Sequence, residues 1–569
     1  MTAGPDGPRV LVLGGGVGGL SAAHELVERG FQVTVLEGRG RPGGKARSIN
    51  AFPAPPGGTP LPGEHGFRFF PGFYQHLPDL MRRIPYGSNP DGVLGNLVAC
   101  DRFEFARTDG PALVLPTHPP TSFDELKLDV HALRTIYAGF GDDDLAYFLS
   151  RVLVLLTSCE ERRYQEWEYT SWWDFSGAST RSAPGGGLSD YQKYLAGGLT
   201  RCFVAARPEL MSARTGGYVG LRLEHDALHR GHAIDRVLNG PTYERWIEPW
   251  LEHLTALGVD IRRHTAVHGI EMDGKRVSAV VAEGPEGLAR YEADYYVAAL
   301  PVEQMRQNAN GEGGLVTAAL MEAEPRLAEL EKLQVNWMNG IQLYLRNDQP
   351  IVNGHTVFAD APWSLTGISQ AQFWRGIDLS TMGDGDVRGI LSIDISSWHT
   401  PGLNGKKAID CEPDEIYAEV LEQVLRHRGA DGKPLFDKDD VVRYYLDHDI
   451  EPLGNSAGPS LNVDLEPLLV NTVGSWVHRP PAVLAIENLF LASDYVQTYT
   501  DLASMEGANE AARRAVNGIL EAAGSSETPC EIWRPAEPAV FAPLRAIDRA
   551  RFKLGQKHHM GPGGPPQPS

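Results

Sequence analysis

The stretch RVLVLGGGVGGL, from Arg9 to Leu20, decides the fold of this chain. Its first five residues predict a buried parallel strand, Val17 to Arg29 predicts an amphipathic helix, and Gln32 to Leu36 predicts a second strand. Glycines between a strand and a helix allow a tight turn, close approach of the backbone to a pyrophosphate and close helix packing. The sequence therefore predicts an α/β fold with a Rossmann-type dinucleotide-binding domain, whose first contacts come from Gly14, Gly16, Val17, Gly18 and Gly19.

Glu37 ends the second predicted strand, where an acid can accept hydrogen bonds from the adenosine ribose hydroxyls. The sequence EGRGRPGGKAR then continues to Arg47 as a basic, glycine-rich loop. Such a loop can carry backbone N–H groups and cations along a second stretch of phosphate and ribityl chain. This favours FAD over NAD as the cofactor, with contacts expected from Gly38, Arg39, Gly44, Lys45 and Ala46.

A segment near the far end of the chain completes the predicted cofactor site. Asn488 to Asp494 predicts a short buried strand that ends in an acid, and Ala503 to Ala508 opens a helix that runs to about Leu520. A helix N-terminus directed at the flavin pyrimidine would stabilise the negative charge that develops at N1 and O2 on reduction. We expect Asp494 to face the ribityl or pyrophosphate region, and the helix start to contribute Met505, Glu506 and Ala508.

The domain organisation is predicted to be discontinuous. Residues 1–75, 235–305 and 485–525 are assigned to the FAD-binding domain, residues 76–234 and 306–484 to an α+β substrate domain, and residues 526–569 to a C-terminal extension with a disordered tail from Gly555. Predicted elements include strands at Val259–Arg262 and Val267–Glu271 and a hairpin of Val277–Ala282 with Tyr291–Val297. Further predictions are an apolar helix at Leu145–Glu161 and one long strand over the flavin at Val335–Leu345.

Composition restricts the partners and the compartment. The net charge of −21 argues against nucleic acid as a partner, because the chain offers no basic field to displace counterions. The five cysteines are scattered and contain no CxxC pair, as expected in a reducing compartment. No signal peptide precedes Arg9 and no apolar run reaches the roughly 18 residues of a membrane span. The sequence predicts a cytoplasmic protein and leaves peripheral contact with a membrane open.

Motifs that the chain lacks limit the chemistry. No second GxGxxG follows a strand, since Arg388 stands where the third glycine after Gly383 and Gly385 would belong. A dedicated NAD(P)H domain is therefore not expected, and the electron acceptor is predicted to be oxygen, a quinone or another diffusible acceptor. No His/Cys cluster has the spacing of a zinc site, and no GxSxG nucleophile motif is present. We predict no metal.

Motifs along most of the chain resemble the FAD-dependent phytoene and zeta-carotene desaturases of the plant and cyanobacterial type, within the flavin amine oxidoreductase superfamily. They are GGGVGGL at Gly14, GGKA at Gly43, EHGFRFFPGFY at Glu64, ARPELMSART at Ala206, VLNGPTYERWIEPWLEHLTALGVDI at Val237, NLFLASDY at Asn488 and LASMEGA at Leu502. The resemblance implies a non-covalently bound FAD, a lipophilic unsaturated substrate and dehydrogenation of C–C bonds. It also implies that Val267 meets the adenine side and that Leu300 and Pro301 lie near the isoalloxazine.

Candidate catalytic residues follow from the same resemblance and from residue type. Arg68, His65 and Tyr499 are the predicted catalytic residues, and Tyr74 and Asn339 are further candidates near the flavin ring. Arg68 lies among four phenylalanines, so its guanidinium must find partners or stack on those rings. The family usually has His where Arg68 stands and a second aromatic residue where Pro71 stands, so the substrate is left open between isoprenoid, carotene and polyene chains.

Three alternatives remain. A flavin amine oxidase would carry a lysine beside flavin N5, where Asn339 or a neighbour stands, and an aromatic residue just before MEGA, where Leu502 to Ser504 stand. An isoprenoid-handling flavoprotein of the hydroxysqualene dehydroxylase type would share the motifs. A prenyl-carrying protein of the Rab escort and dissociation-inhibitor type would lack FAD, but its glycine motif is degenerate, whereas the motif at Gly14 is intact.

Overall fold

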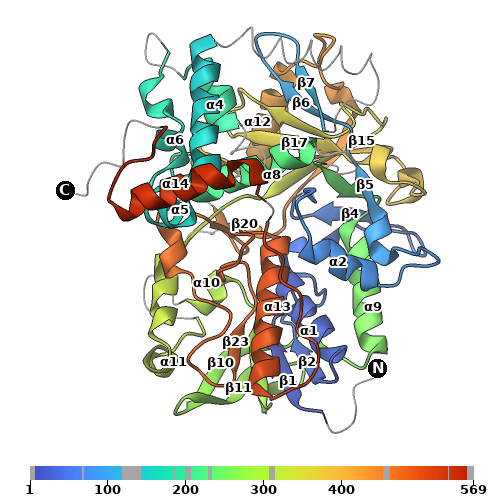
Figure 1. Cartoon of the computed structure of the whole chain (residues 1–569). Coiled ribbons are helices and arrows are strands. Elements are labelled where there is room, and N and C mark those ends of the chain that lie inside the picture. Colours follow the sequence, from blue (N-terminus) through green and yellow to red (C-terminus); the bar gives the residue numbers. More distant parts are fainter. Residues whose placement is uncertain are drawn as a thin grey trace.

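A computed structural model describes residues 7–66, 69–117, 142–183, 188–198, 207–228, 234–306, 314–452, 462–535 and 537–560. A five-stranded parallel sheet of order β23-β13-β1-β2-β9 lies in the lower half of the molecule in Figure 1. Its strands come from three separate parts of the chain: β1 (Arg9–Leu13) and β2 (Gln32–Leu36), β9 (Asp260–Arg262) and β13 (Tyr295–Ala298), and β23 (Leu489–Leu491). The predicted Rossmann-type architecture is confirmed.

Two helices from opposite ends of the chain pack together against this sheet. They are α1 (Val17–Val27) and α13 (Met505–Ala522), which lie side by side in Figure 1. All residues of α1 are buried, and Asn509 of α13 donates a hydrogen bond of 2.8 Å to the Ser21 hydroxyl. The predicted strand at Gln32–Leu36 is confirmed, and the first helix ends at Val27, before the predicted Arg29.

A three-stranded antiparallel meander adjoins the parallel sheet. It consists of β10 (Ala266–Asp273), β11 (Arg276–Gly284) and β12 (Gly287–Tyr291). The predicted turn at Gly284–Gly287 is present, but the predicted strand Tyr291–Val297 is wrong. Residues 295–298 instead form β13, whose Tyr296, Val297 and Ala298 are fully buried in the parallel sheet. A continuous apolar run of this kind fits a strand covered on both faces, and the polar residues before it end the meander.

The upper half of Figure 1 contains a seven-stranded mixed sheet of order β19-β15-β18-β17-β16-β6-β7. Only the β16–β6 pair is parallel among its pairings. The strands are β6 (Arg102–Ala106), β7 (Leu113–Pro116), β15 (Gly340–Leu345), β16 (His355–Phe358), β17 (Leu365–Ser369), β18 (Gly389–Ile395) and β19 (Val441–Leu446). They fall in the segments that the sequence assigns to a substrate domain, whose boundaries remain a prediction.

The predicted long strand Val335–Leu345 is wrong as a single element. Residues Gln334–Asn336 form β14, which pairs with β22 (Leu468–Val470), whereas residues Gly340–Leu345 form β15 in the large sheet. The break has a polar cause, because the Asn339 side chain is buried and donates hydrogen bonds to two carboxylates, Asp447 and Asp464. These side-chain bonds fix Asn339 at the point where the chain leaves one sheet and enters the other.

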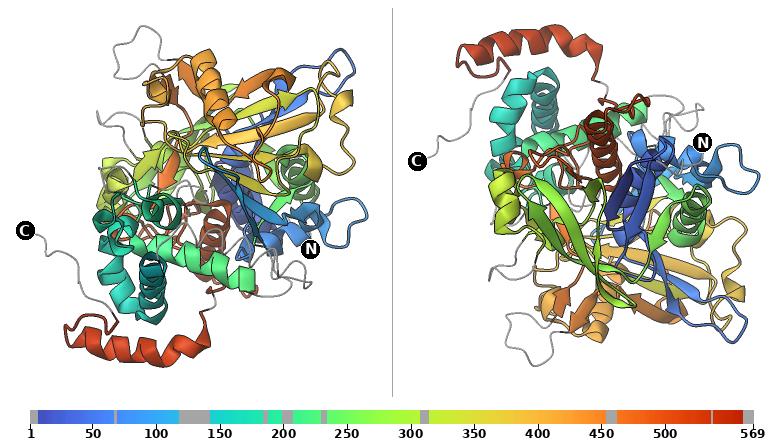
Figure 2. Two further views of the ribbon diagram at one scale, coloured as in Figure 1. Left: turned by 90° about the horizontal axis from the view of Figure 1, so that it is seen from above. Right: turned by 90° about the horizontal axis from the view of Figure 1, so that it is seen from below.

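Helices form a separate layer at the upper left of Figure 1. The predicted helix Leu145–Glu161 is two helices, α4 (Asp142–Thr157) and α5 (Glu160–Gln165). The hydroxyls of Thr157 and Ser158 bond back to the carbonyls of Leu153 and Val154, which is how a helix end is satisfied locally. The helix α14 (Ala542–Lys553) lies outside both, as the two views of Figure 2 show.

Part of the C-terminal extension packs on α14. His558 is buried, and its Nε2 lies 3.9 Å from Asp548 of α14. The disorder of the tail from Gly555 stays a prediction. Residues 561–569 lie outside the described residues. In the described part of the chain, no helix is long and apolar enough to cross a membrane.

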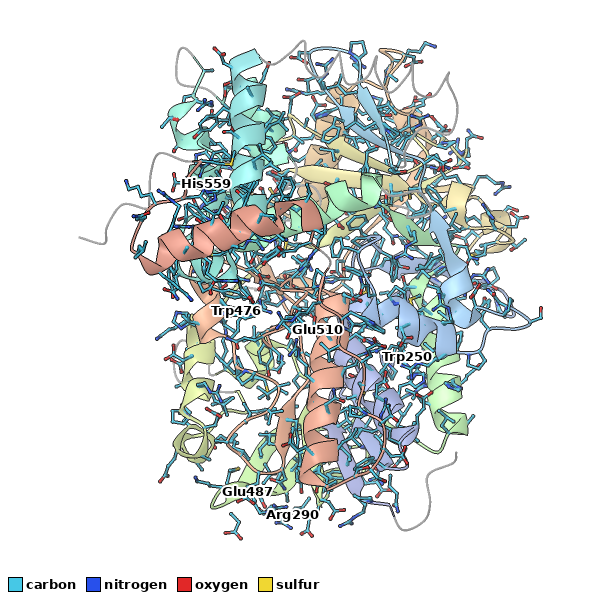
Figure 3. The ribbon with its side chains drawn as sticks, viewed as in Figure 1. Trp250, Arg290, Trp476, Glu487, Glu510 and His559 are labelled. Carbon is cyan, nitrogen blue, oxygen red and sulfur yellow. The ribbon has the colours of Figure 1, made fainter. Side chains whose placement is uncertain are left out.

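Smaller elements connect these layers. The remaining strands are β3 (Ser48–Phe52), β4 (Leu61–Glu64), β5 (Leu97–Ala99), β8 (Arg236–Leu238), β20 (Ile450–Pro452) and β21 (Asn462–Asp464), and the remaining helices are α2 (His76–Arg83), α6 (Trp172–Phe175), α8 (Ala213–Leu228), α9 (Glu248–Ala256), α10 (Val302–Met305), α11 (Ala318–Ala323) and α12 (Pro413–Arg426). Tryptophans serve mainly as core residues: Trp250, labelled in Figure 3, stacks on Trp246 with ring centroids 6.0 Å apart.

Candidate cofactor and substrate cavity

The glycine turn after β1 has the geometry that the sequence predicts. Gly14 has φ of +100°, a left-handed conformation that favours glycine. A Cβ on Gly19 would lie 1.9 Å from the Gly14 carbonyl oxygen, and one on Gly18 would lie 2.0 Å from that of Ala492. Helix α1 begins after Gly16 with no side-chain cap, so its first N–H groups and the positive end of its dipole can meet a pyrophosphate.

Glu37 organises the loop that follows β2. Its two carboxylate oxygens accept hydrogen bonds of 2.8 Å from the backbone N–H groups of Gly15 and Arg39. Burial raises the pKa of Glu37, and these bonds and the nearby arginines only partly offset that effect. The carboxylate therefore lines the cavity in a position fixed by the turn that it adjoins, and its contact with the ribose stays a prediction.

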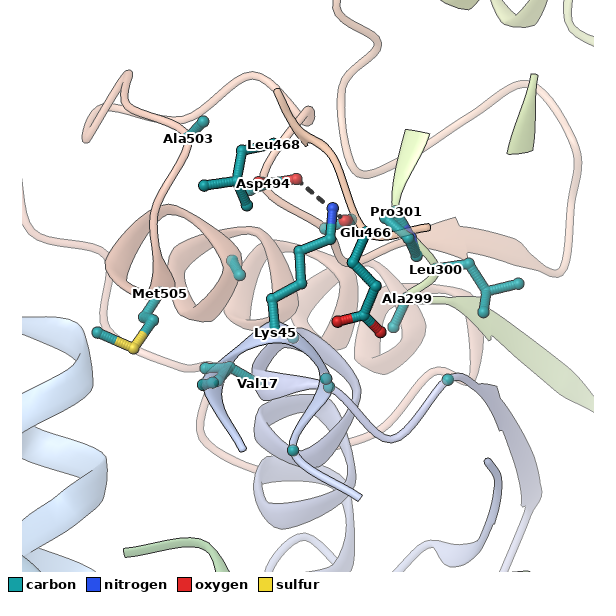
Figure 4. Close-up of a pocket in the computed structure, with 18 of the residues that line it drawn as sticks. Val17, Lys45, Ala299, Leu300, Pro301, Glu466, Leu468, Asp494, Ala503 and Met505 are labelled. Atoms are coloured by element: carbon teal, nitrogen blue, oxygen red, sulfur yellow. Dashed lines mark hydrogen bonds between the residues drawn. The ribbon is translucent and has the colours of Figure 1, made fainter. Parts of the chain in front are cut away.

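A second glycine-rich turn lies against the first. Gly43 and Gly44 have φ of +122° and +56°, and a Cβ on Gly44 would lie 3.0 Å from the Gly16 Cα. Lys45 extends from this turn across the cavity (Figure 4), where its amino group pairs with Glu303 at 2.7 Å and donates to the carbonyl of Pro467. The two turns form a backbone cradle with room for phosphate and ribityl groups.

These turns, the strand ends and the N-terminus of α13 surround a cavity of about 520 Å³. Most residues predicted to bind the cofactor line it: Gly14, Gly16, Val17, Gly18, Glu37, Gly38, Arg39, Gly44, Lys45, Ala46, Val267, Leu300, Pro301, Asp494, Met505 and Ala508. Figure 4 shows Val17, Leu300, Asp494 and Met505 around the same space. Ser504 caps α13 by accepting from the Gly507 N–H. The donor set fits FAD, with an acid for ribose, one helix start for pyrophosphate and another for the ring.

Two predicted cofactor residues do not line the cavity. Gly19 serves the packing of α1 on β1, as its contact with Gly14 shows. Glu506 is fully buried and accepts hydrogen bonds from the backbone N–H groups of Gln75, His76 and Leu77, at the N-terminus of α2. Burial raises the pKa of Glu506, but His76 and these N–H groups outweigh it and lower that pKa below its usual range. Its carboxylate anchors α2 to α13.

The predicted catalytic residues are separated by the structure. His65 lines the cavity, as does Tyr74, the pKa of which burial raises. Arg68 lies outside the described residues. Tyr499 does not line this cavity; it borders a smaller pocket of about 240 Å³, and its ring lies between Arg514 and Arg534 with each guanidinium 4.4 Å from the ring centroid. Asn339 is also absent from the lining.

A buried acidic network beside His65 was not predicted from the sequence. It consists of two pairs of acids, each pair spaced two residues apart. Asp447 and Asp449 follow β19, whereas Asp464 ends β21 and Glu466 follows it. Alternation of acids over two residues, as in Asp447-His-Asp449, is the signal that could have indicated them. Asp449 and Glu466 pair with the arginines of the basic loop: Arg39 at 3.1 and 2.7 Å, and Arg47 at 3.3 and 3.1 Å.

The arginines determine the electrostatics of this network. Burial raises the pKa of Glu466, but Arg47 and Arg39 outweigh it and lower that pKa. His65, Asp449 and Glu466 place possible metal ligands within 4.8 Å of one another. Two guanidinium groups already neutralise these carboxylates, so the arrangement is that of an ion-pair network rather than a metal centre.

The rest of the cavity wall is mainly apolar. None of the eleven tryptophans, all within the described residues, lines it, although the sequence made them candidates for an apolar pocket. The apolar and aromatic lining residues are Phe69, Pro71, Phe73, Tyr74, Val219, Leu315, Leu465, Leu468, Leu502 and Ala503. A surface of this kind suits a lipophilic ligand that lies beside the cofactor.

Comparisons with known proteins identify the family of this chain and several relatives. A sequence profile of the flavin containing amine oxidoreductases matches residues 17–520. Carotenoid phi-ring synthase from Chlorobaculum tepidum is 37% identical over 83 residues, which are 14% of this chain and 12% of that protein. Protoporphyrinogen oxidase 2 from Arabidopsis thaliana is 58% identical over 44 residues, 8% of this chain and 9% of that protein. The chain thus matches about a tenth of the length of these curated relatives.

Solved structures are similar to this chain over most of its length. Cyclohexylamine oxidase from Brevibacterium oxydans IH-35A has a TM-score of 0.57 at 13% identity, covering 91% of this chain and 100% of that one. Putrescine oxidase bound to putrescine has a TM-score of 0.55 at 14% identity, covering 90% and 99%. At these identities the likeness establishes the fold.

Proposed function

The chain belongs to the flavin containing amine oxidoreductase family and is an FAD-dependent oxidoreductase with non-covalently bound FAD, and from this premise we propose its reaction. The reaction that we propose is dehydrogenation of C–C bonds in a lipophilic unsaturated substrate, such as an isoprenoid, carotene or polyene chain. The observation that carries the proposal is the apolar and aromatic lining of the cavity beside the cofactor cradle. The similarity to carotenoid phi-ring synthase over 83 residues supports the same substrate class.

Three of the four carboxylates that line the cavity are engaged by the protein itself, and the fourth, Asp494, accepts from the Ser493 hydroxyl at 3.3 Å and is predicted to face the ribityl or pyrophosphate region of the cofactor. Glu37 accepts two backbone N–H groups, Glu303 pairs with Lys45, and Glu466 pairs with Arg39 and Arg47. An amine ligand is usually held by an available carboxylate or by aromatic faces. Leu502, Ala503 and Ser504 line the cavity where an amine oxidase would place an aromatic residue. These contacts favour a lipophilic substrate over a cationic one.

The protein contributes positioning and charge. When bound, FAD supplies the hydride acceptor. The glycine turns and Glu37 would hold its nucleotide half, and the N-terminus of α13 would provide positive potential for the negative charge of the reduced ring. The apolar side chains orient the substrate and exclude water from the reacting carbons. Oxygen, a quinone or another diffusible acceptor would then reoxidise the enzyme.

A flavin amine oxidase is the second candidate function, because the family and the fold of cyclohexylamine oxidase and putrescine oxidase favour it. Asn339, one of the positions considered for a lysine beside the flavin, does not line the cavity and its amide bonds to carboxylates. A dehydroxylase acting on a hydroxysqualene-like isoprenoid would use the same apolar wall, but replacing C–OH by C–H consumes two electrons, so it would oxidise the reduced flavin instead of bleaching the oxidised form.

The test is anaerobic reduction of the purified enzyme by candidate substrates. Detergent-dispersed squalene, a hydroxylated squalene, a linear carotene and a set of primary amines and polyamines are mixed with the enzyme, and the visible flavin absorbance is followed. We expect bleaching by an isoprenoid or polyene, with a product two mass units lighter in the mass spectrum. Bleaching by amines alone would overturn the proposal in favour of an amine oxidase. Precipitation with acid should release the flavin into solution as FAD.

A further inference from the structure

We propose that His65 is the proton-accepting residue of this cavity and that the buried Asp447 is the residue that positions it. The inference rests on the proposed dehydrogenation, which removes a hydride and a proton from neighbouring carbons. It assigns a role to a carboxylate that lies far from the cofactor motifs in sequence and does not line the cavity. The supporting observations are the geometry of the His65–Asp447 pair, its backbone anchoring and the polar groups behind it.

His65 and Asp447 form a close, buried pair. The imidazole Nδ1 lies 2.5 Å from Asp447 Oδ2, and the two side chains are 8% and 1% exposed. His65 directly follows β4 and lines the cavity, whereas Asp447 directly follows β19 behind it. A carboxylate on Nδ1 fixes the neutral imidazole as the tautomer with hydrogen on Nδ1, which leaves the lone pair on Nε2.

Gly340 joins the two segments through its backbone. Its N–H donates to the His65 carbonyl at 2.8 Å, and its carbonyl accepts from the Asp447 N–H at 3.1 Å. A Cβ on Gly340 would lie 3.1 Å from the His65 oxygen and 3.1 Å from the Gly66 Cα, so a side chain here would have to displace this backbone by a few tenths of an ångström. The pair is therefore held in register by the first residue of β15 and not only by the contact between its two side chains.

Two further polar groups hold Asp447. Asn339 Nδ2 donates to Asp447 Oδ2 at 2.8 Å and to Asp464 Oδ1 at 3.3 Å. Burial raises the pKa of Asp447, but His65, His448 and Asn339 outweigh it and hold that pKa well below its usual range. Burial raises the pKa of Asp464 to about 6. Asp447 is thus the permanent anion of the group, which stabilises the imidazolium that forms when His65 takes a proton.

Charged groups from several segments surround this imidazole. Lys45, Arg39 and Arg47 belong to the basic loop, and the two arginines neutralise Asp449 and Glu466. The other facing groups are Asp464, the half-exposed His448, Glu64, which accepts from Thr242, and Asp394, which lies against Gly66. Asp449 and Glu466 have arginine partners, whereas Asp447 is the carboxylate in ion-pair contact with the ring, 2.5 Å from Nδ1.

The proton transfer balances with the proposed reaction. One C–H bond of the substrate breaks and its electron pair leaves with hydrogen as hydride, for which FAD is the two-electron acceptor. The electron pair of the neighbouring C–H bond becomes the new π bond, and its proton goes to Nε2 of His65. Asp447 takes no proton; it holds the ring and stabilises the positive charge.

Three variants of the holoenzyme test the proposal. We expect His65→Gln and Asp447→Asn to keep the FAD content and to lower kcat by about 100-fold or more, and the double variant to fall no further than His65→Gln alone. The matched control is Asp235→Asn, which breaks the other buried pair of this geometry, with His355 Nδ1 at 2.5 Å from Asp235 Oδ2 and neither residue lining the cavity. We expect the control to keep wild-type kcat and its pH profile.

A spectroscopic measurement tests the His65–Asp447 pair independently of which substrate the enzyme uses. In protein labelled with ¹⁵N-histidine, the signal lost in His65→Gln identifies His65, and at high pH it should report hydrogen on Nδ1 and a lone pair on Nε2. In Asp447→Asn this tautomer should change, and the pH profile of kcat should shift. Wild-type kcat in Asp447→Asn, or hydrogen on Nε2 in the wild type, would overturn the dyad. If no isoprenoid is a substrate but the tautomer is as stated, the proposed function fails and the pairing stands.

Discussion

Glu37 illustrates how one side chain serves both the protein and the ligand. Its carboxylate holds Gly15 and Arg39 through their N–H groups and lines the cavity, where we predict that it also accepts from the ribose hydroxyls. In Glu37→Gln one oxygen becomes an NH₂ group that opposes a backbone N–H, and the charge is lost. Losing a charge-assisted hydrogen bond costs about 1.5 to 3 kcal/mol, so FAD should bind roughly 10- to 150-fold more weakly.

Titration of the apoprotein with FAD, followed by flavin fluorescence, measures this change. Glu283→Gln is the control, because Glu283 is exposed on β11 and lies at no cofactor contact. The affinity of Glu37→Gln should also lose its dependence on acid, since protonation of Glu37 in the wild type removes the same acceptor. An unchanged FAD affinity in Glu37→Gln would contradict the ribose role.

Glu104 predicts a pH dependence of stability. Burial, together with Asp431, raises its pKa to about 7, and its Oε1 has no hydrogen-bond partner. Between its ordinary pKa of 4.5 and about 7, the folded protein keeps a proton that the unfolded chain releases, so stability falls as the pH rises through this window. Glu104→Gln should therefore stabilise the protein at pH 8 by about 1 to 3 kcal/mol, and very little at pH 4.5.

Thermal unfolding of wild type and Glu104→Gln at both pH values measures the difference. The melting temperature of the variant should exceed that of the wild type at pH 8 and match it at pH 4.5. An equal difference at the two pH values would show that packing, and not ionisation, sets the effect.

Residues of the cofactor cradle could be predicted from the sequence, because their constraints are local. Gly14 and Gly44 need positive φ, and Glu37 ends a strand that the alternation of residues already indicates. Asp447 and Asp464 could not be predicted in this way. Their role depends on contacts with His65 and Asn339, which are distant in the sequence. These residues come together because β15 pairs with β19 and because β21 lies beside them.

At the scale of elements, the sequence correctly predicted helices and strands whose own apolar pattern shows which residues are buried. The strands β1 and β2 and the helix α13 follow from their apolar patterns. The prediction failed at Val335–Leu345 and at Tyr291–Val297, where apolar residues on the two sides of a break were joined into one predicted strand. In both places the chain passes from one sheet to another, and hydrogen bonds distant in sequence determine the break. Periodicity carries no information about such a transfer.

The helix α14 provides an element-scale prediction. Asp548 is fully buried; its carboxylate accepts from the Cys159 N–H at 2.8 Å and pairs with the buried Arg162 at 3.0 Å. Asp548→Asn removes one anion and leaves the guanidinium with Glu166 and the carbonyl of Gln556. The attachment of α14 should weaken by about 2 to 4 kcal/mol, because an incompletely compensated charge stays buried.

Hydrogen exchange and limited proteolysis of residues 537–560 measure this attachment. The control is Arg549→Gln, which removes an exposed pair on the same helix, with Glu161 at 2.9 Å. Exposed pairs contribute about 0 to 1 kcal/mol, so exchange in the control should barely change. Equal protection in Asp548→Asn and the wild type would mean that apolar packing alone holds α14.

At the scale of the whole molecule, the cofactor cradle and the mixed sheet meet around one cavity. The cradle contributes strands from both ends of the chain, and the mixed sheet contributes β15 and β19, which carry the polar network beside His65. This arrangement would place the nucleotide half of FAD among backbone groups and its ring among the side chains that we propose to determine the chemistry. The choice of substrate therefore depends on the residues of the second half, where the sequence resembles known families least.

The same architecture restricts which electron donors can reduce the flavin. In the described residues, Gly383 and Gly385 have φ of +55° and +81° and lie in a turn that leads into β18, a strand. A pyrophosphate site needs a helix N-terminus after the glycines, so this turn cannot replace the one at Gly14. We therefore predict that neither NADH nor NADPH reduces the flavin at a useful rate, whereas dithionite, which needs no binding site, does so readily. Anaerobic mixing followed by visible absorbance decides the matter, because bleaching by NADPH as fast as turnover would require a nucleotide site beyond the cavity described above.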